Sequence, residues 1–94
     1  MTTRTRPIAA LFIGLPGDAR DVECCDIFER HGGEFVNSGS FVETRERDVE
    51  YDVPRQSVRR CVDALRAAGF DVAVGAAAIR EYWEEQLGRA GAPR

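Results

Sequence analysis

The sequence contains no lysine and only one histidine among its 94 residues. Its three cysteines are Cys24, Cys25 and Cys61, and the adjacent pair has the wrong spacing for a Cys-x-x-Cys redox or zinc site. We therefore expect reduced thiols, with at least Cys25 and Cys61 packed as small core residues. The sequence predicts neither a metal site nor a cofactor.

Long apolar runs are missing as well. No stretch approaches the roughly 18 apolar residues of a membrane span, and residues 1–6 are too short and polar to lead a signal peptide. The length suits one domain, and the 44% hydrophobic and 31% charged fractions suit a folded globule. These features predict a single cytoplasmic domain that does not contact membranes.

Positive charge is scarce in the middle of the chain. The net charge is −3, and residues 18–52 hold eleven carboxylates against four arginines. A basic footprint for nucleic acid is therefore missing, and the central segment is distinctly acidic.

Apolar periodicity divides the chain into strands and helices. It predicts strands over 8–13, 34–43, 47–53 and 70–74, and helices over 18–31, 55–68 and 76–87. Asp18 is placed to cap the first helix, and Gly32-Gly33 and Gly69 to end the first two helices. Gly39 predicts a weak or bulged centre in the second strand. Residues 1–7 are expected to form a disordered arm and residues 88–94 a flexible tail.

The order β-α-β-β-α-β plus a C-terminal helix predicts an α+β, ferredoxin-like sandwich over 8–75. Right-handed crossovers give an antiparallel sheet of strand order 4-1-3-2, with both main helices on one face. The other sheet face is left open. The helix over 76–87 either packs on that face or anchors a dimer or partner through an apolar side formed by Ile79, Tyr82, Trp83 and Leu87.

In the third strand Asp48, Glu50 and Asp52 alternate with Val49, Tyr51 and Val53, which are expected on the other face. Glu46 extends the acidic series, which thus consists of Glu46, Asp48, Glu50 and Asp52. Because strand residues two apart share a face, these side chains point the same way, about 6.6–6.8 Å apart. The simplest interpretation is a solvated sheet face. Four like charges in a row repel each other, however, and their spacing resembles that of phosphates along an extended strand. The alternative is an acidic docking surface for a basic partner, with the chain acting as a decoy that inhibits a nucleic-acid-binding protein.

Residues 8–74 resemble an RNA recognition motif. Leu11-Phe12-Ile13-Gly14-Leu15-Pro16 is similar to that family's motif in the first strand, and Asp26-Ile27-Phe28-Glu29-Arg30-His31-Gly32 fits the end of its first helix. The resemblance implies an RNA-binding sheet with Phe12 at a base-stacking position on the open face. The family's stacking positions on the third strand fall here at Glu46 and Asp48, which makes the motif degenerate and argues against nucleic acid.

A second resemblance is to ACT-type regulatory domains. Pro16-Gly17-x-Ala19-x-x-Val22 is similar to that family's Pro-Gly turn into the first helix, and Leu65-x-x-x-Gly69-Phe70-x-Val72 also fits its pattern. This resemblance implies a homodimer that binds an amino acid or a similar small ligand around Leu15, Pro16 and Gly17.

No nucleophile, base and acid converge in the sequence, so we expect no enzymatic activity. The favoured function is a non-catalytic protein–protein interaction module with a basic partner. Its expected contact residues are Glu46, Asp48, Glu50, Asp52, Phe12, Tyr82 and Trp83. The alternatives are an ACT-like ligand-binding regulatory domain and a degenerate RNA-binding domain.

Overall fold

The computed structural model describes the backbone of residues 4–41 and 43–90, and the side chains of 4–41 and 43–85. Its elements, in chain order, are β1 (Thr5–Ile13), α1 (Ala19–Arg30), β2 (Glu34–Phe41), β3 (Glu46–Pro54), a 3-10 turn (Arg55–Ser57), α2 (Val58–Ala67), β4 (Asp71–Val74) and α3 (Ala76–Ala90). None of the described helices is long and apolar enough to span a membrane.

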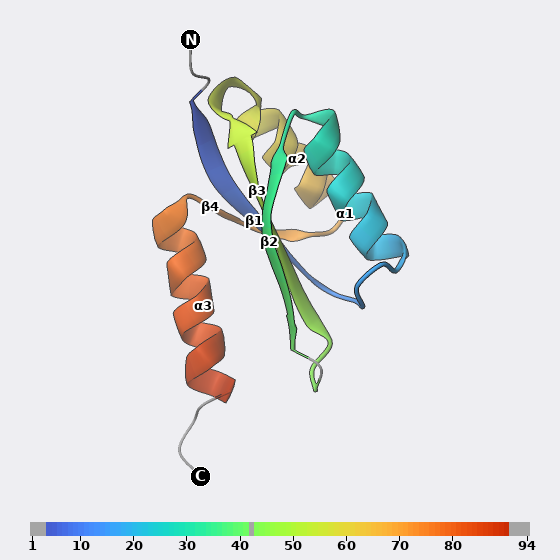
Figure 1. The fold of residues 1–94 in the computed structure, drawn as a ribbon, viewed down its shortest axis with the longest axis vertical. Coiled ribbons are helices and arrows are strands. Elements are labelled where there is room, and N and C mark those ends of the chain that lie inside the picture. The colour runs from blue at the N-terminus through green and yellow to red at the C-terminus, as the bar shows by residue number, and fades with distance from the viewer. Residues whose placement is uncertain (1–3, 42, 91–94) are drawn as a thin grey trace.

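The four strands form one antiparallel sheet in the order β2-β3-β1-β4. This is the predicted order 4-1-3-2 counted from the opposite edge, so the α+β class and the sheet topology are confirmed. Helices α1 and α2 lie on one side of the sheet and α3 lies on the other (Figure 1). We call these sides the α1/α2 face and the α3 face.

The two ends of the chain are more regular than expected. β1 begins at Thr5, which pairs with Pro54, so residues 5–7 are strand and not a disordered arm. α3 continues to Ala90, beyond the expected end at residue 87. Residues 1–3 of the expected arm and 91–94 of the expected tail lie outside the described residues, as does residue 42 of the predicted second strand.

The main core lies between the sheet and the α1/α2 layer. The alternation of β3 places Val49, Tyr51 and Val53 in it, as predicted, and Phe28 of α1 stacks on Tyr51 with ring centroids 4.4 Å apart. Alternation buries one side of a strand because successive side chains point to opposite faces.

The cysteines of the core differ in part from the expectation. Cys24 and Cys61 are fully buried, whereas Cys25 is only half-buried against the core. Burial raises the pKa of the Cys24 thiol to about 12 and that of the Cys61 thiol to about 11.

The ends of α1 follow the predicted caps. The Asp18 carboxylate accepts a hydrogen bond from the Asp21 amide, and the Gly33 amide donates to the Phe28 carbonyl past a left-handed Gly32. The helical spacing of Val22, Cys25 and Phe28 predicts that all three face the core, but Val22 is 53% exposed. Asp21 takes the buried position instead, because it pairs with Arg47 of β3.

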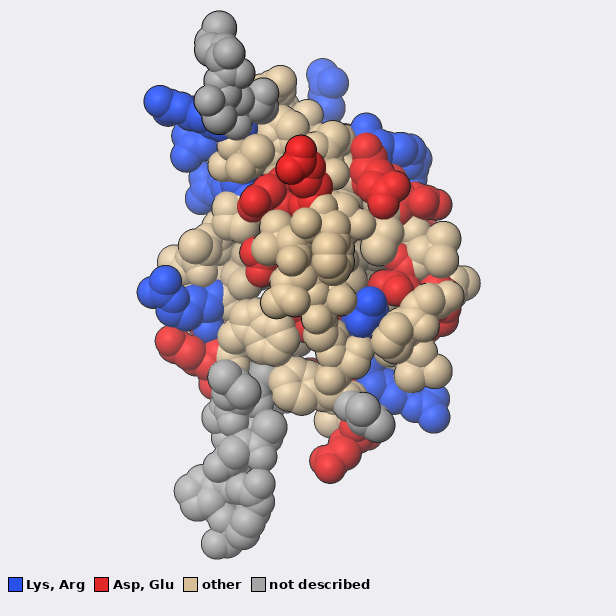
Figure 2. Space-filling view, in the orientation of Figure 1, with Lys and Arg blue, Asp and Glu red and all other residues tan. Residues whose placement is uncertain are grey.

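The bulge in β2 lies at Val36 and not at Gly39. Pairing with β3 shifts between Phe35 and Asn37, so Val36 is the extra residue, whereas Gly39 pairs regularly with Asp48. β2 is an edge strand without a charged residue between 35 and 41, and Phe35 and Val36 are exposed. In the view of Figure 2, uncharged side chains occupy most of the centre of the molecule, with charged ones mainly around them.

Candidate functional site

The four acidic side chains of β3 all belong to the α3 face. We call Glu46, Asp48, Glu50 and Asp52 the acidic row. They alternate with three residues that are buried in the core on the other face. Their neighbours on β1 are small or apolar, and Asp48 lies opposite Leu11 there and opposite Gly39 of β2. The β2 neighbours of the other end of the row are polar, since Asn37 lies opposite Glu50 and Glu34 lies opposite Asp52. The row therefore crosses the middle of the sheet, between strands on both sides.

The α3 face is not open, because α3 packs on it. Ile79 is buried, and Tyr82 and Trp83 are half-buried. The Trp83 ring lies 6.2 Å from that of Phe41 at the end of β2. Of the two roles predicted for this helix, the structure therefore contains the packed one. The side chain of Leu87, assigned to the same apolar side, lies outside the described residues.

Asp48 is the most deeply buried member of the acidic row, with 2% of its surface exposed. A Cβ atom placed on Gly39 would lie 3.0 Å from Asp48 Oδ1 and 3.2 Å from Trp83 Cη2. The carboxylate and the indole ring thus both lie close over the bare backbone of Gly39. This crowding explains why glycine, and not a larger residue, occupies that strand position.

Among the described residues, Asp48 Oδ1 is the buried side-chain atom that has no hydrogen-bond partner. Burial raises the pKa of Asp48 to about 6, against a lowering effect of the neighbouring Arg47 charge, and Glu50 raises it further. A buried carboxylate without a partner is costly in its charged form. The structure therefore places its least satisfied polar group under α3.

The rest of the acidic row is partly accessible. Glu46, Glu50 and Asp52 are each half-exposed. The pKa of Glu50 is also raised, first by burial and then by the charge of Asp52 two residues away. The row is therefore neither a fully solvated face nor a fully buried one.

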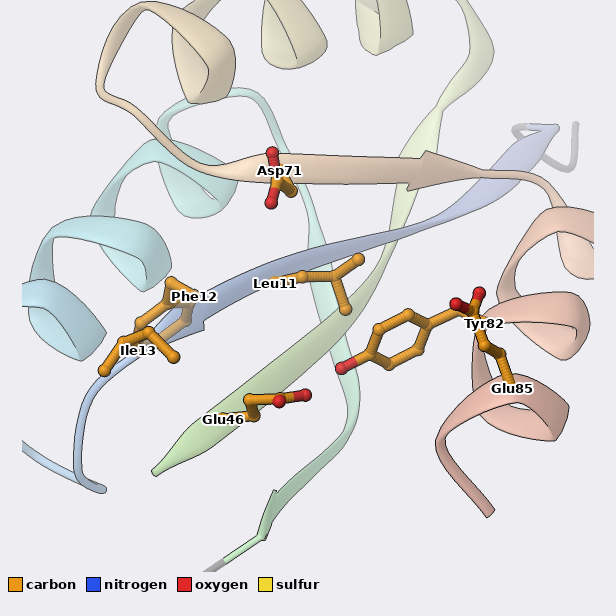
Figure 3. A pocket seen from close by; sticks show the side chains of 7 residues that line it. All are labelled: Leu11, Phe12, Ile13, Glu46, Asp71, Tyr82 and Glu85. Atoms are coloured by element: carbon orange, nitrogen blue, oxygen red, sulfur yellow. The ribbon is translucent and has the colours of Figure 1, made fainter. Parts of the chain in front are cut away.

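Beside the acidic row lies a hollow of about 380 Å³ between α3 and the end of the sheet, which we call the end groove. β4 pairs only with residues 8–11 of β1, so the last two residues of β1 extend past it. Figure 3 shows the Tyr82 ring reaching from α3 toward the sheet, between Leu11 and Glu46. The groove is lined by Leu11, Phe12, Ile13, Glu46, Asp71, Tyr82 and Glu85.

The lining of the end groove combines two kinds of surface. Leu11 and Ile13 are apolar, and Glu46, Asp71 and Glu85 bring carboxylates from three different elements. Within the described part of the chain, no group of three or more His, Cys, Asp or Glu residues is arranged to hold a metal ion. A hollow of this kind suits an organic cation with an apolar stem, such as an arginine or lysine side chain.

Phe12 does not occupy the stacking position that the RNA-binding resemblance implied. Its ring packs edge-on against Phe70, with centroids 5.1 Å apart, and against the core on the α1/α2 face. Phe12 borders the end groove but belongs to the opposite face from the acidic row. The prediction that its ring lies on the same face as that row is therefore wrong, and its contact with a partner stays a prediction.

Leu15, Pro16 and Gly17 form an exposed turn between β1 and α1. The Leu15 amide donates to Asp18 Oδ2 at 2.8 Å, and the Gly17 amide donates to Asp21 Oδ2. The Leu15 and Asp21 amides lower the pKa of Asp18. Because carboxylates of the chain itself already engage the amides of Leu15 and Gly17, these donors are not free for the carboxylate of an amino-acid ligand. Ligand binding at this turn stays a prediction.

Sequence reasoning missed two of the three carboxylates that line the end groove. Asp71 and Glu85 were not singled out, because Asp71 is a lone acid in β4 and Glu85 is one of three glutamates of α3 without a pattern that sets it apart. They line the same hollow as Glu46 only when β4 and α3 come together beside β1. The alternation of β3 was the signal that found Glu46, and no comparable local pattern marks the other two.

Comparison of the chain with protein-family models, with curated proteins and with solved structures finds no match. The α3 face, with its acidic row and its end groove, is the candidate functional site.

Proposed function

We propose that this chain is a non-catalytic interaction module with a ferredoxin-like fold, and that it binds a basic segment of a protein partner at the end groove and along the acidic row. The observation that carries the proposal is that Glu46, Asp71 and Glu85 all line the hollow whose floor is apolar. Three carboxylates from three separate elements favour a cation there over any neutral or anionic group.

The groove supports both parts of an arginine or lysine side chain. The alkyl stem would lie over Leu11 and Ile13, and the cationic head would meet the carboxylates, with the Tyr82 ring as an additional cation–π surface. A single exposed ion pair contributes only about 0.2–1 kcal/mol. Useful affinity therefore requires several basic residues, which the acidic row could receive in succession.

The spacing along the acidic row favours an extended partner segment. Alternate strand residues lie about 6.6–6.8 Å apart, close to the spacing of phosphates along an extended nucleic-acid strand. An arginine-rich segment that normally binds a phosphate backbone would meet a similar line of charges here. This supports a partner that is itself a nucleic-acid-binding protein, held by the chain in place of its nucleic acid.

A binding assay with a fluorescently labelled hexa-arginine peptide tests the proposal, with anisotropy as the readout. We expect binding by the native chain and a loss of about tenfold in affinity in the double variant Glu46→Gln/Asp71→Asn. The matched control is Asp26→Asn/Asp63→Asn, which removes the same charge from exposed positions of α1 and α2. Equal losses in both double variants would show attraction to net charge alone and would contradict the proposed site.

The RNA-binding alternative is tested in the same assay with a labelled single-stranded oligouridine. We expect no binding, because the acidic row repels phosphates and the described part of the α3 face presents no aromatic residue on β1 or β3 for a base to stack on. Saturable binding of the oligonucleotide would overturn the protein-partner proposal in favour of RNA.

A further inference from the structure

The unpartnered carboxylate of Asp48 lies at the centre of the acidic row and beneath α3. It is 2% exposed, and its Oδ1 atom has no hydrogen-bond partner among the described residues. Buried polar atoms are almost always hydrogen-bonded, so such an exception calls for a physical reason. One such reason is that the carboxylate binds an ion or a side chain supplied by another molecule.

The groups packed around Asp48 supply no cation that reaches it. The Arg47 guanidinium, next in sequence, points to the opposite face and is held there by Asp21 and Ser40. Arg80 of α3 is exposed. The other residues near Asp48 on the four strands and on α3 are acidic or uncharged. On the strands they are Glu46, Glu50 and Asp52 of β3, Asn37, Gly39 and Phe41 of β2, Leu11 of β1 and Asp71 of β4. On α3 they are Trp83, which lies over Gly39, and its neighbour Glu84.

The helix above Asp48 is joined to the sheet by a single residue. Gly75 separates β4 from α3, has a left-handed φ of 91°, and donates its amide to the Pro7 carbonyl. Glycine at such a position permits a change of backbone direction with little strain. A rotation at Gly75 would lift the side of α3 that carries Trp83 and leave the sheet pairing intact.

We propose that Asp48 is the carboxylate that receives a cationic side chain of the basic partner, and that α3 is a cover which the partner displaces. This inference rests on the proposed function and gives it a mechanism. In the closed state the end groove is the accessible part of the site. In the partner-bound state α3 has moved off the sheet together with Tyr82 and Glu85, so the contacts of the closed end groove are replaced by contacts along the whole acidic row, from Glu46 to Asp52.

Replacement of the Trp83 ring by a cation of the partner next to Asp48 is favourable for an electrostatic reason. In the closed state the Asp48 carboxylate faces an indole ring and loses its hydration without an opposite charge in return. If an arginine of the partner took the place of the Trp83 ring next to Asp48, its guanidinium could donate two charge-assisted hydrogen bonds to the carboxylate. The partner thus pairs with Asp48 Oδ1, the buried side-chain atom that lacks a hydrogen bond among the described residues, and gains a site that the closed state hides.

Trp83 provides the readout, because it is the only tryptophan in the sequence. Titration of the unlabelled hexa-arginine peptide into the full chain should shift the Trp83 emission to longer wavelength as the ring enters water. The shift should saturate at the same peptide concentration as the anisotropy. The variant Asp48→Asn should bind about tenfold more weakly and show a smaller shift, whereas the control Asp63→Asn should behave as the native chain.

The pH dependence of peptide binding gives a second measurement. The peptide does not titrate, so binding by the native chain should tighten as Asp48 loses its proton between about pH 5 and pH 7. This step should be absent in Asp48→Asn and present in Glu50→Gln, which controls for the neighbouring acid. His31 lies on the other side of the sheet, where its Nδ1 atom contacts the Ile27 carbonyl, and does not face Asp48.

The outcomes separate the two proposals. Peptide binding that leaves the Trp83 emission unshifted, with unchanged affinity in Asp48→Asn, would overturn the displacement of α3 and preserve the end groove as the binding site. An absence of binding in the anisotropy assay would overturn both proposals. Near-UV circular dichroism of Asp48→Asn, compared with the native chain, ensures that a loss of affinity is not a loss of fold.

Discussion

The two faces of β3 bury neighbouring charged residues in opposite ways. On the α1/α2 face Arg47 is 8% exposed, and its guanidinium donates to both carboxylate oxygens of Asp21 and to Ser40 Oγ. Asp21 also accepts from the Gly17 amide, so the pair is well satisfied. On the α3 face Asp48 is buried more deeply, yet its Oδ1 atom has no partner.

The difference indicates that the buried charge on the α1/α2 face is paired in a way that supports stability, whereas the buried charge on the α3 face is not. A fully satisfied polar network makes a core specific, whereas an incompletely satisfied one costs stability. Violations of packing and pairing rules in natural proteins tend to fall at functional sites. The contrast within one strand therefore favours the α3 face, and not the larger core, as the part of the fold that would change if the proposed partner binds.

The largest expected effect on stability comes from removing the ion pair between Arg47 and Asp21 on the α1/α2 face. Arg47→Met leaves the Asp21 carboxylate buried without its cation, and we expect a loss of about 3–5 kcal/mol in the free energy of unfolding. Urea denaturation followed by far-UV circular dichroism measures it. The double variant Arg47→Met/Asp21→Leu should recover most of the loss, because it removes the uncompensated charge as well. A loss below about 1 kcal/mol in the single variant would show that the two faces do not differ as described.

A smaller effect of opposite sign is expected on the α3 face. Asp48→Asn should raise the free energy of unfolding by about 1–3 kcal/mol at about pH 8, because it removes a buried charge. Burial raises the pKa of Asp48 from 3.8 to about 6, so in that window the folded chain retains a proton that the unfolded chain has lost. Native stability therefore falls as pH rises through the window, and the cost is complete above it.

The pH profile of Asp48→Asn checks this assignment. The advantage of the variant should disappear below about pH 4, where Asp48 is protonated in both the folded and the unfolded chain. Urea denaturation at several pH values measures the difference. A constant difference from acid to neutral pH would mean that the effect comes from packing and not from the charge of Asp48.

A change of one methyl group tests the contact under α3. In Gly39→Ala the added Cβ would crowd both Asp48 Oδ1 and Trp83 Cη2, so one of them must move. We expect a loss of about 1 kcal/mol and a shift of the Trp83 emission to longer wavelength without any peptide. Ser38→Ala, one residue earlier in the strand and on the other face, is the control. An unshifted emission in Gly39→Ala would show that the Asp48 side chain moves to accommodate the added methyl group and that α3 keeps its position.

The smallest expected effect is a difference in the urea concentration at which the two sides of the sheet open. Cys24 and Cys61 are buried in the α1/α2 core, so their reaction with a disulfide reagent reports opening of that side. Trp83 reports opening of the other side. At urea concentrations below the main transition, we expect the Trp83 emission to change before these thiols become reactive. Simultaneous changes in both signals would show that α3 and the core open as one unit.

Much of this arrangement follows from local pattern. The alternation of β3 correctly assigned the acidic row to one face and Val49, Tyr51 and Val53 to the other. Asp18 and Gly32 correctly marked the ends of α1. These predictions succeed because each depends on neighbours within a few residues, where side-chain direction and backbone conformation are set by sequence.

The errors occurred where local pattern is ambiguous. β1 is apolar from Ile8 to Ile13, so periodicity does not show which residues face α1 and α2, and Phe12 was assigned to the wrong side. Val22 was assigned to the core because it is apolar, although Asp21 is buried there through its ion pair with Arg47, 26 residues away.

By itself the sequence determined the order of the elements, the topology of the sheet and the acidic character of one face. Only the tertiary structure decided that α3 covers this face, that Asp48 is buried beneath Trp83, and that Asp71 and Glu85 join Glu46 in one groove. The reason is physical: alternation fixes the direction of a side chain along its own strand. Burial and the convergence of charges depend on which distant element packs against that strand.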